Sequence, residues 1–143
     1  MAELLYIYPF SETNSSAGDS IRWLEAEDID IFNQHLAACG QKPIAEKLWK
    51  EIYSEGTMYC GKFIGNLMVA RACVEKYSDE YWEVADVRTA REYRNCGCAA
   101  EVCTFVLNYI LSQNKNATIR TEEDNVPMQR VITHLGFVPF GAE

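Results

Sequence analysis

The chain has 143 residues, of which 48% are hydrophobic and 24% are charged, and its formal net charge is −8. These values are typical of one ordinary globular domain, and they exclude a disordered chain, a collagen-like chain and a coiled coil. The acidic balance argues against a nucleic acid as partner, and no apolar run approaches the roughly 18 residues that a membrane-spanning helix needs.

The first 20 residues are interpreted as an extension of the domain. Residues 4–10 are apolar and predict a strand, without the basic segment and cleavage site of a secretory signal. Residues 11–20 are rich in Ser, Asn and Gly and predict the loop that follows. We therefore expect one domain over residues 1–143 in the cytoplasm, where the six cysteines stay reduced.

From residue 21 onward, hydrophobic periodicity and turn residues predict strands and helices in succession. Strands are expected at 21–24, 58–64, 67–74, 81–89, 117–121 and 137–140, with Gly65-Asn66 as a hairpin turn. Helices are expected from Asp28 to Gly40, from Pro43 to Gly56, over 97–113, and from the cap Asn125 to Gly136.

Strand 81–89 matters most for the fold class. Simple alternation places Glu83 and Val87 on one face of this strand and Asp86 on the other. Because helix 97–113 separates it from strand 117–121, these two strands should be parallel, whereas the hairpins before them should be antiparallel. The expected fold is a mixed α/β sheet, mostly antiparallel, flanked by about four helices.

The stretch after strand 81–89 carries the clearest chemical signal. A tight loop leads into a helix there, and the unpaired N–H groups of a helix start attract anions. Gly97 and the small Ala99 let a phosphate approach the backbone, and Arg94 adds a charge, with Arg88 and Arg91 close by in sequence. The residues predict a diphosphate-binding loop. It is neither a P-loop nor a dinucleotide fingerprint, because both glycine patterns are absent.

Two motifs resemble one known family. Residues 94–99, Arg-Asn-Cys-Gly-Cys-Ala, resemble the coenzyme A pyrophosphate loop of the GNAT N-acetyltransferase superfamily, Arg/Gln-x-x-Gly-x-Gly/Ala. Residues 125–137, Asn-Val-Pro-Met-Gln-Arg-Val-Ile-Thr-His-Leu-Gly-Phe, resemble that family's Asn-x-x-Ala-x-x-Leu-Tyr-x-x-Leu-Gly-Phe helix. The resemblance implies a sheet in which strands 81–89 and 117–121 splay apart around acyl-CoA.

The resemblance also implies where the co-substrate acetyl-CoA binds. The backbone of Val87 and Thr89 would pair with its pantetheine arm, which Asn125 would contact. The pyrophosphate would be held by the loop residues Arg94, Asn95, Cys96, Gly97, Cys98 and Ala99. No metal is expected, because the cysteines here lack a CxxC pair and both histidines stand far off in sequence.

The implied activity is direct transfer of an acetyl group to a primary amine. Several family members use a carboxylate on the strand before the loop as general base, which makes Glu83 the catalytic candidate and Asp86 the second choice. The family's tyrosine, which protonates the departing thiolate, is replaced here by Ile132. The thiolate then leaves toward water, or another group such as Tyr93 serves as the acid.

Three questions stay open at this point. The family's seventh strand is missing after residues 137–140, and either residues 4–10 or the partner chain of a homodimer would take its place. In this family the loop after the first strand of the domain borders the acceptor side. In this chain that loop is acidic, which would favour a cationic amine; its acidic residues are Glu25, Glu27, Asp28 and Asp30. The absent tyrosine favours one rival to an enzyme, a GNAT-like acyl-CoA sensor or interaction module without turnover, and a nucleotide-phosphate binder with an unrelated fold is a separate alternative.

Overall fold

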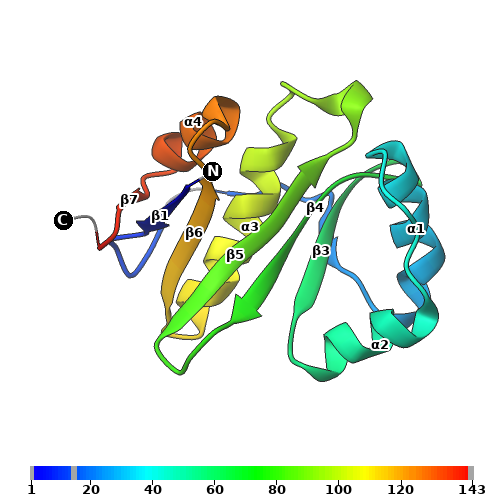
Figure 1. The fold of residues 1–143 in the computed structure, drawn as a ribbon, viewed down its shortest axis with the longest axis horizontal. Coiled ribbons are helices and arrows are strands. Elements are labelled where there is room, and N and C mark those ends of the chain that lie inside the picture. The colour runs from blue at the N-terminus through cyan, green and yellow to red at the C-terminus, as the bar shows by residue number, and fades with distance from the viewer. Residues whose placement is uncertain (1, 14–15, 142–143) are drawn as a thin grey trace.

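The computed structural model describes residues 2–13 and 16–141, and its strands form one seven-stranded sheet in the order β2-β3-β4-β5-β6-β1-β7 (Figure 1). The strands are β1 (Glu3–Ile7), β2 (Ile21–Trp23), β3 (Met58–Ile64), β4 (Leu67–Lys76), β5 (Tyr81–Thr89), β6 (Asn116–Glu122) and β7 (Val138–Pro139). The helices are α1 (Ile29–Ala38), α2 (Glu46–Ser54), α3 (Cys98–Ser112) and α4 (Val126–His134). Within the described residues, none of these helices is long and apolar enough to cross a membrane.

The sheet has a hydrophobic core on each face. On one face the apolar stripe of α3 packs on the strands, and Val102, Val106 and Ile110 are fully buried there. On the other face Phe32 of α1 and Trp49 of α2 join a second core. Residues 68–74 of β4 are buried between the two layers. β5 therefore lies next to a strand that is buried over seven consecutive residues.

The predicted parallel pair opens partway along its length. β5 and β6 pair in parallel from Tyr81 with Asn116 up to Val84 with Ile119, and the other pairs in the sheet are antiparallel. Beyond Val84, β5 continues to Thr89 without β6 as a partner. The two strands diverge toward the top of Figure 1. This divergence, called the splay below, confirms the fold expected from the sequence.

The N-terminal strand lies inside the sheet and not at its edge. β1 pairs antiparallel with β6 along its whole length and with β7 at Tyr6–Pro139 and Ile7–Val138. Beyond β1, Tyr8 is buried with its ring edge-on to Phe137 at 5.4 Å between centroids. The chain itself therefore supplies the strand next to β7, although the strand covers residues 3–7 and not the expected 4–10.

The second helix begins later than Pro43 predicts. α2 starts at Glu46, and its N-cap Ala45 is extended, with φ −77° and ψ 152°. Asn33 of α1 holds the preceding segment in place, since its side chain accepts from the Ile44 N–H at 2.9 Å and donates to the Ile44 carbonyl at 3.2 Å. This tertiary contact keeps residue 44 out of the helix, although proline is favourable at a helix start.

Candidate active site

A cavity of about 480 Å³ lies where the end of β5, the start of α3 and the start of α4 meet. It contains every residue predicted to hold acetyl-CoA except Cys96, which is exposed and does not line it. Its lining residues are Val87, Arg88, Thr89, Tyr93, Arg94, Asn95, Gly97, Cys98, Ala99, Ala100, Asn125, Pro127, Met128 and Val131. The fold thus brings the two sequence motifs, one before α3 and one in α4, to a single cavity.

The loop before α3 has a backbone suited to an anion. Asn95 and Gly97 both adopt left-handed conformations, with φ of 64° and 84°. Alternating left-handed residues turn neighbouring N–H groups toward one concave side. Gly97 is the N-cap of α3, a helix of 15 residues whose positive dipole end adds to this field. Together these features make the loop a candidate site for a phosphate group.

Arg94 is fixed at the edge of the same cavity. Its Nε donates to the carbonyl oxygen of Thr89 at 3.2 Å, so the loop folds back on the end of β5. The guanidinium keeps its other N–H groups for further acceptors. Arg94 therefore places a positive charge between the phosphate loop and the strand edge exposed by the splay.

The start of α4 forms the opposite wall. The Asn125 Oδ1 atom accepts from the Met128 N–H at 3.2 Å, which confirms Asn125 as the N-cap. Met128 and Val131, expected to be only core residues, are partly buried and line the cavity. A helical apolar stripe looks the same in sequence whether it faces side chains or a pocket, so no local signal separates these roles.

A second cavity of about 410 Å³ opens on the other side of the splay. It shares Val87, Arg88, Asn125 and Met128 with the first cavity. Its remaining lining residues come from β1, β5 and β6, and are Glu3, Glu83, Val84, Ala85, Asp86, Ile119, Arg120, Thr121 and Glu122. The shared residues mean that the two cavities are neighbours, separated by side chains of β5 and α4.

Glu83 lies where β5 and β6 begin to diverge, and it faces the second cavity. Its side chain, 3% exposed, accepts from Thr118 Oγ1 at 3.0 Å and from Arg120 Nε and Nη2 at 2.9 and 3.2 Å. These hydrogen bonds raise the pKa of Arg120, because the guanidinium charge is stabilised by the carboxylate. The predicted base is therefore placed at the splay, with Arg120 between its carboxylate and solvent.

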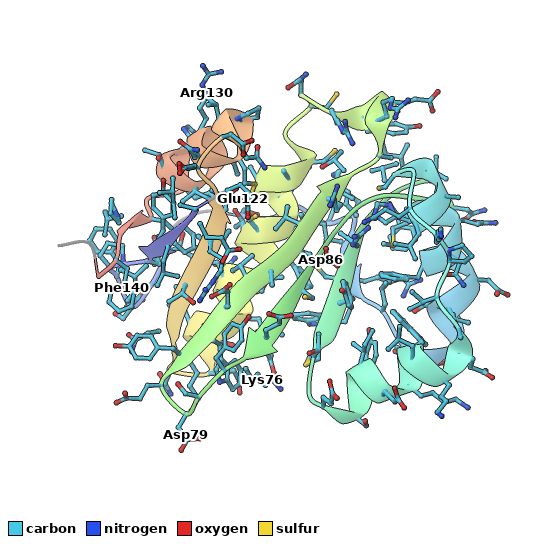
Figure 2. The ribbon with its side chains drawn as sticks, viewed as in Figure 1. Lys76, Asp79, Asp86, Glu122, Arg130 and Phe140 are labelled. Atoms are coloured by element: carbon cyan, nitrogen blue, oxygen red, sulfur yellow. The ribbon has the colours of Figure 1, made fainter. Side chains whose placement is uncertain are left out.

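Asp86 does not follow the alternation expected from the sequence. A bulge interrupts the pairing of β4 with β5 between Arg71 and Cys73, and Asp86 within it has φ 50°. The expectation that Asp86 faces away from the Glu83 side is wrong, because this extra residue turns its carboxylate toward Tyr59 and Arg71. Figure 2 labels Asp86 on β5 and Glu122 at the upper end of β6, on the two strands that border the splay.

The acidic stretch before α1 is not part of this second cavity. Asp28 forms an ion pair with Arg22 at 2.9 Å and accepts from the Glu25 N–H at 2.7 Å, as a helix-start carboxylate does. The carboxylates that do line the cavity come from β1, β5 and β6, and are Glu3, Glu83, Asp86 and Glu122. Sequence reasoning missed Glu3 and Glu122, because only the tertiary pairing of β1 with β6 brings them there.

Ile132 is fully buried in the core beside α3 and lines neither cavity, whereas Tyr93 lines the first one.

Among the residues that the structure describes, no group of three or more His, Cys, Asp or Glu side chains is arranged to hold a metal ion. All six cysteines have free thiols.

Comparison with known proteins identifies the family that this fold and these motifs resemble. The model of the acetyltransferase (GNAT) family matches residues 20–137. The fold is similar to a GNAT-family protein from Novosphingobium aromaticivorans, with 22% identity, a TM-score of 0.78, and coverage of 96% of this chain and 59% of that one. It is also similar to a GNAT-family acetyltransferase from Colwellia psychrerythraea, with 23% identity, a TM-score of 0.77, and coverage of 96% and 52%.

A third similar structure contains a coenzyme A derivative. It is AAC(6')-Iy in complex with the bisubstrate analog CoA-S-monomethyl-acetylneamine, with 15% identity, a TM-score of 0.72, and coverage of 86% of this chain and 92% of that one. No curated protein sequence matches the chain. The present chain spans only 59% and 52% of the first two structures.

The splayed sheet and the loop before α3 agree with the family match. The chain belongs to the GNAT acetyltransferase family.

Proposed function

We propose that residues 1–143 form one domain that transfers an acetyl group from acetyl-CoA directly to a primary amine. The observation that carries this proposal is the first cavity, which both sequence motifs line and which shares four lining residues with a second cavity lined by ionisable side chains. The similar structure that contains a CoA bisubstrate analog supports the same donor.

In the proposed reaction each part of the chain has a physical task. The loop N–H groups and Arg94 bind the pyrophosphate, and the free edge of β5 at Val87 and Thr89 aligns the pantetheine arm. The amine nitrogen attacks the thioester carbon, the C–S bond breaks, and the thiolate leaves toward water or Tyr93. A backbone N–H at the splay stabilises the developing oxyanion. Glu83 is the proposed acceptor of the proton that nitrogen loses.

The charge of the second cavity supports a cationic acceptor. Its lining carboxylates, Glu3, Glu83, Asp86 and Glu122, outnumber its arginines, Arg88 and Arg120. Such a lining attracts an ammonium ion more than an anion. Polyamines, lysine side chains and amino sugars are therefore the acceptor classes to test. We expect the protein to act on them in the cytoplasm.

Thermal unfolding with acetyl-CoA tests the donor site. A ligand at about a hundred times its dissociation constant stabilises by about 2.7 kcal/mol, which for a domain of this size raises Tm by about 5–10 °C. Gly97→Glu should abolish the rise, because it places a carboxylate in the phosphate loop. Gly65→Glu is the matched control, since both glycines are left-handed and a Cβ at either meets no atom within 4 Å.

Thiol release with the amine panel then separates an enzyme from a binding module. An enzyme releases coenzyme A thiol in proportion to acetylated amine. A rise in Tm without thiol release would instead support the non-catalytic acyl-CoA sensor, for which the missing tyrosine at Ile132 is the supporting observation. A larger rise with ADP than with coenzyme A would contradict both and favour a nucleotide-phosphate binder.

A further inference from the structure

We propose that Asp86 accepts a hydrogen bond from the acceptor nitrogen, and that buried Arg71 and Tyr59 hold the Asp86 carboxylate in place for this contact. The inference rests on the proposed function, because it concerns the acceptor half of the same site. It assigns a role in acceptor binding to three residues that lie outside both sequence motifs, 94–99 and 125–137.

The backbone at Asp86 is the first observation. Asp86 has φ 50°, a left-handed conformation that a residue other than glycine adopts at a cost. It lies at the bulge where β5 departs from its regular pairing with β4, two residues beyond the last pair with β6. Bulges redirect side chains, and here the bulge brings a carboxylate to the wall of the second cavity.

The partners of Asp86 are the second observation. Oδ2 accepts from the Tyr59 hydroxyl at 2.6 Å and from Arg71 Nε at 3.2 Å, and Oδ1 accepts from Arg71 Nη2 at 3.1 Å. Arg71 is 2% exposed, whereas the Asp86 side chain is 38% exposed. A buried guanidinium and a buried phenol therefore orient a carboxylate that still reaches the cavity.

The Tyr59 hydroxyl remains a donor in this arrangement. Burial, with a further contribution from the nearby carboxylate, raises the pKa of Tyr59 far above its usual value. The phenol thus stays protonated and keeps its hydrogen bond to Oδ2. Since each carboxylate oxygen can accept two hydrogen bonds, Oδ1 with its single donor keeps capacity for one more.

Comparison with Glu83 shows why Asp86 is the contact residue. Glu83 is 3% exposed, and both of its oxygens accept from Arg120, which lies between them and solvent. The arginine that binds Asp86 is Arg71, which is buried in the core, whereas the Asp86 side chain is 38% exposed and lines the second cavity. An ammonium ion that enters the second cavity therefore meets Asp86 without displacing another side chain.

The test compares two tyrosines of one aromatic cluster, of which Tyr59 donates a hydrogen bond to Asp86 and Tyr53 donates to a backbone carbonyl. Tyr59→Phe removes the hydrogen bond to Asp86 and leaves the ring beside Phe32 and Trp49. Tyr53→Phe is the control for loss of a phenol from the same aromatic cluster: the Tyr53 hydroxyl donates to the Leu24 carbonyl at 2.9 Å and accepts from the Tyr59 backbone N–H at 3.4 Å, and it makes no hydrogen bond to Asp86. Steady-state rates of thiol release are measured with spermidine, a lysine-containing peptide and glucosamine.

We expect Tyr59→Phe to lower kcat/KM for the amine about 10-fold, while KM for acetyl-CoA is unchanged and Tyr53→Phe keeps the wild-type amine kinetics. Asp86→Asn should lower kcat/KM for the amine about 100-fold. Because Asp86→Asn also leaves the Arg71 charge without its partner and destabilises the fold, Tyr59→Phe is the decisive variant.

The outcomes separate the two proposals. A wild-type protein that turns over an amine while Tyr59→Phe behaves like Tyr53→Phe overturns the assignment of Asp86 and leaves the proposed function intact. Equal losses for acetyl-CoA and amine in Tyr59→Phe overturn it as well, because they indicate a general structural effect. A wild-type protein that releases no thiol with any of the three amines overturns the proposed function, and the assignment of Asp86 with it.

Discussion

At the scale of single residues, two carboxylates of β5 differ mainly in what surrounds them. Glu83 is enclosed by Thr118 and Arg120 from β6, whereas Asp86 is supported from the core by Tyr59 and Arg71. A base that takes up a proton during the reaction must contact the nitrogen, so Glu83 acts as the base only when Arg120 moves away from its carboxylate, whereas the Asp86 side chain is 38% exposed. The two residues are therefore distinguished by substitutions that keep their size.

Glu83→Gln tests the general base. Loss of a general base lowers rates by about 10²- to 10⁴-fold, and we expect kcat for the amine to fall by at least the lower figure. Glu75→Gln is the control, since Glu75 lies opposite Glu83 on β4 and its carboxylate accepts from Tyr77 at 2.6 Å. If Glu83→Gln keeps the pH–rate profile of the wild-type enzyme, Glu83 is not the base.

His35 gives a prediction about stability and pH. Burial, assisted by the charge of Arg71, lowers the pKa of His35 to about 4 from the 6.5 of a free histidine. The unfolded chain therefore binds a proton that the folded chain does not between these values, so stability is complete above pH 6.5 and falls as pH drops toward 4. From pH 7 to pH 5 this histidine should cost about 2 kcal/mol.

Urea unfolding at the two pH values measures that effect. The fall in unfolding free energy should be smaller by about 2 kcal/mol in His35→Asn. His134→Asn should keep the wild-type fall, because His134 is exposed at the end of α4. An unchanged pH dependence in His35→Asn would contradict the assignment of the acid sensitivity to this residue.

At the scale of elements, the N-terminal ends of α3 and α4 face the same cavity. The α3 end brings unpaired N–H groups, and the α4 end brings Asn125, which both caps its helix and lines the cavity. Removing the Asn125 side chain should therefore change both the stability of the fold and the affinity for acetyl-CoA. A substitution that keeps the helix cap distinguishes the two effects.

Asn125→Asp and Asn125→Ala form that pair. Aspartate caps as well as asparagine, whereas alanine costs about 1 kcal/mol. If the Asn125 amide contacts the pantetheine arm, both variants bind acetyl-CoA more weakly by about 10-fold, as measured by calorimetry. Weaker binding in Asn125→Ala alone would assign the effect to the cap.

At the scale of the whole molecule, β1 joins the two ends of the described chain. Residues 3–7 lie between β6 and β7, and Tyr8 packs on Phe137 and against Gly136. The N-terminal residues therefore complete the sheet beside the second cavity, where Glu3 lies 3.8 Å from Arg120.

Tyr8→Ala should lower the unfolding free energy by about 3 kcal/mol, the cost of removing a buried aromatic ring. Phe10→Ala should change it by less than about 0.5 kcal/mol, because Phe10 is 62% exposed. Denaturant unfolding measures both. Similar small effects of the two substitutions would show that the N-terminal segment adds little to the fold.

The sequence alone determined the features that depend on neighbouring residues. The 3.6-residue and two-residue periodicities predict nearly all helices and strands, and the Gly65-Asn66 turn and the Asn125 cap are confirmed. The loop that lines the first cavity could also be located from the sequence, because its motif lies in consecutive residues from Arg94 to Ala99, and its binding of a phosphate stays a prediction. The start of α2 could not, since it depends on a contact between the side chain of Asn33 in α1 and the backbone of Ile44, which no local helix signal reveals.

Only the tertiary structure decided the acceptor side. The position of β1 depends on pairing across more than a hundred residues, and it is what brings Glu3 to the cavity. The orientation of Asp86 depends on a bulge and on contacts with Tyr59 and Arg71, which alternation within one strand does not reveal. Local patterns specify backbone hydrogen bonding, whereas the environment of a carboxylate is set by whichever distant side chains the fold packs against it.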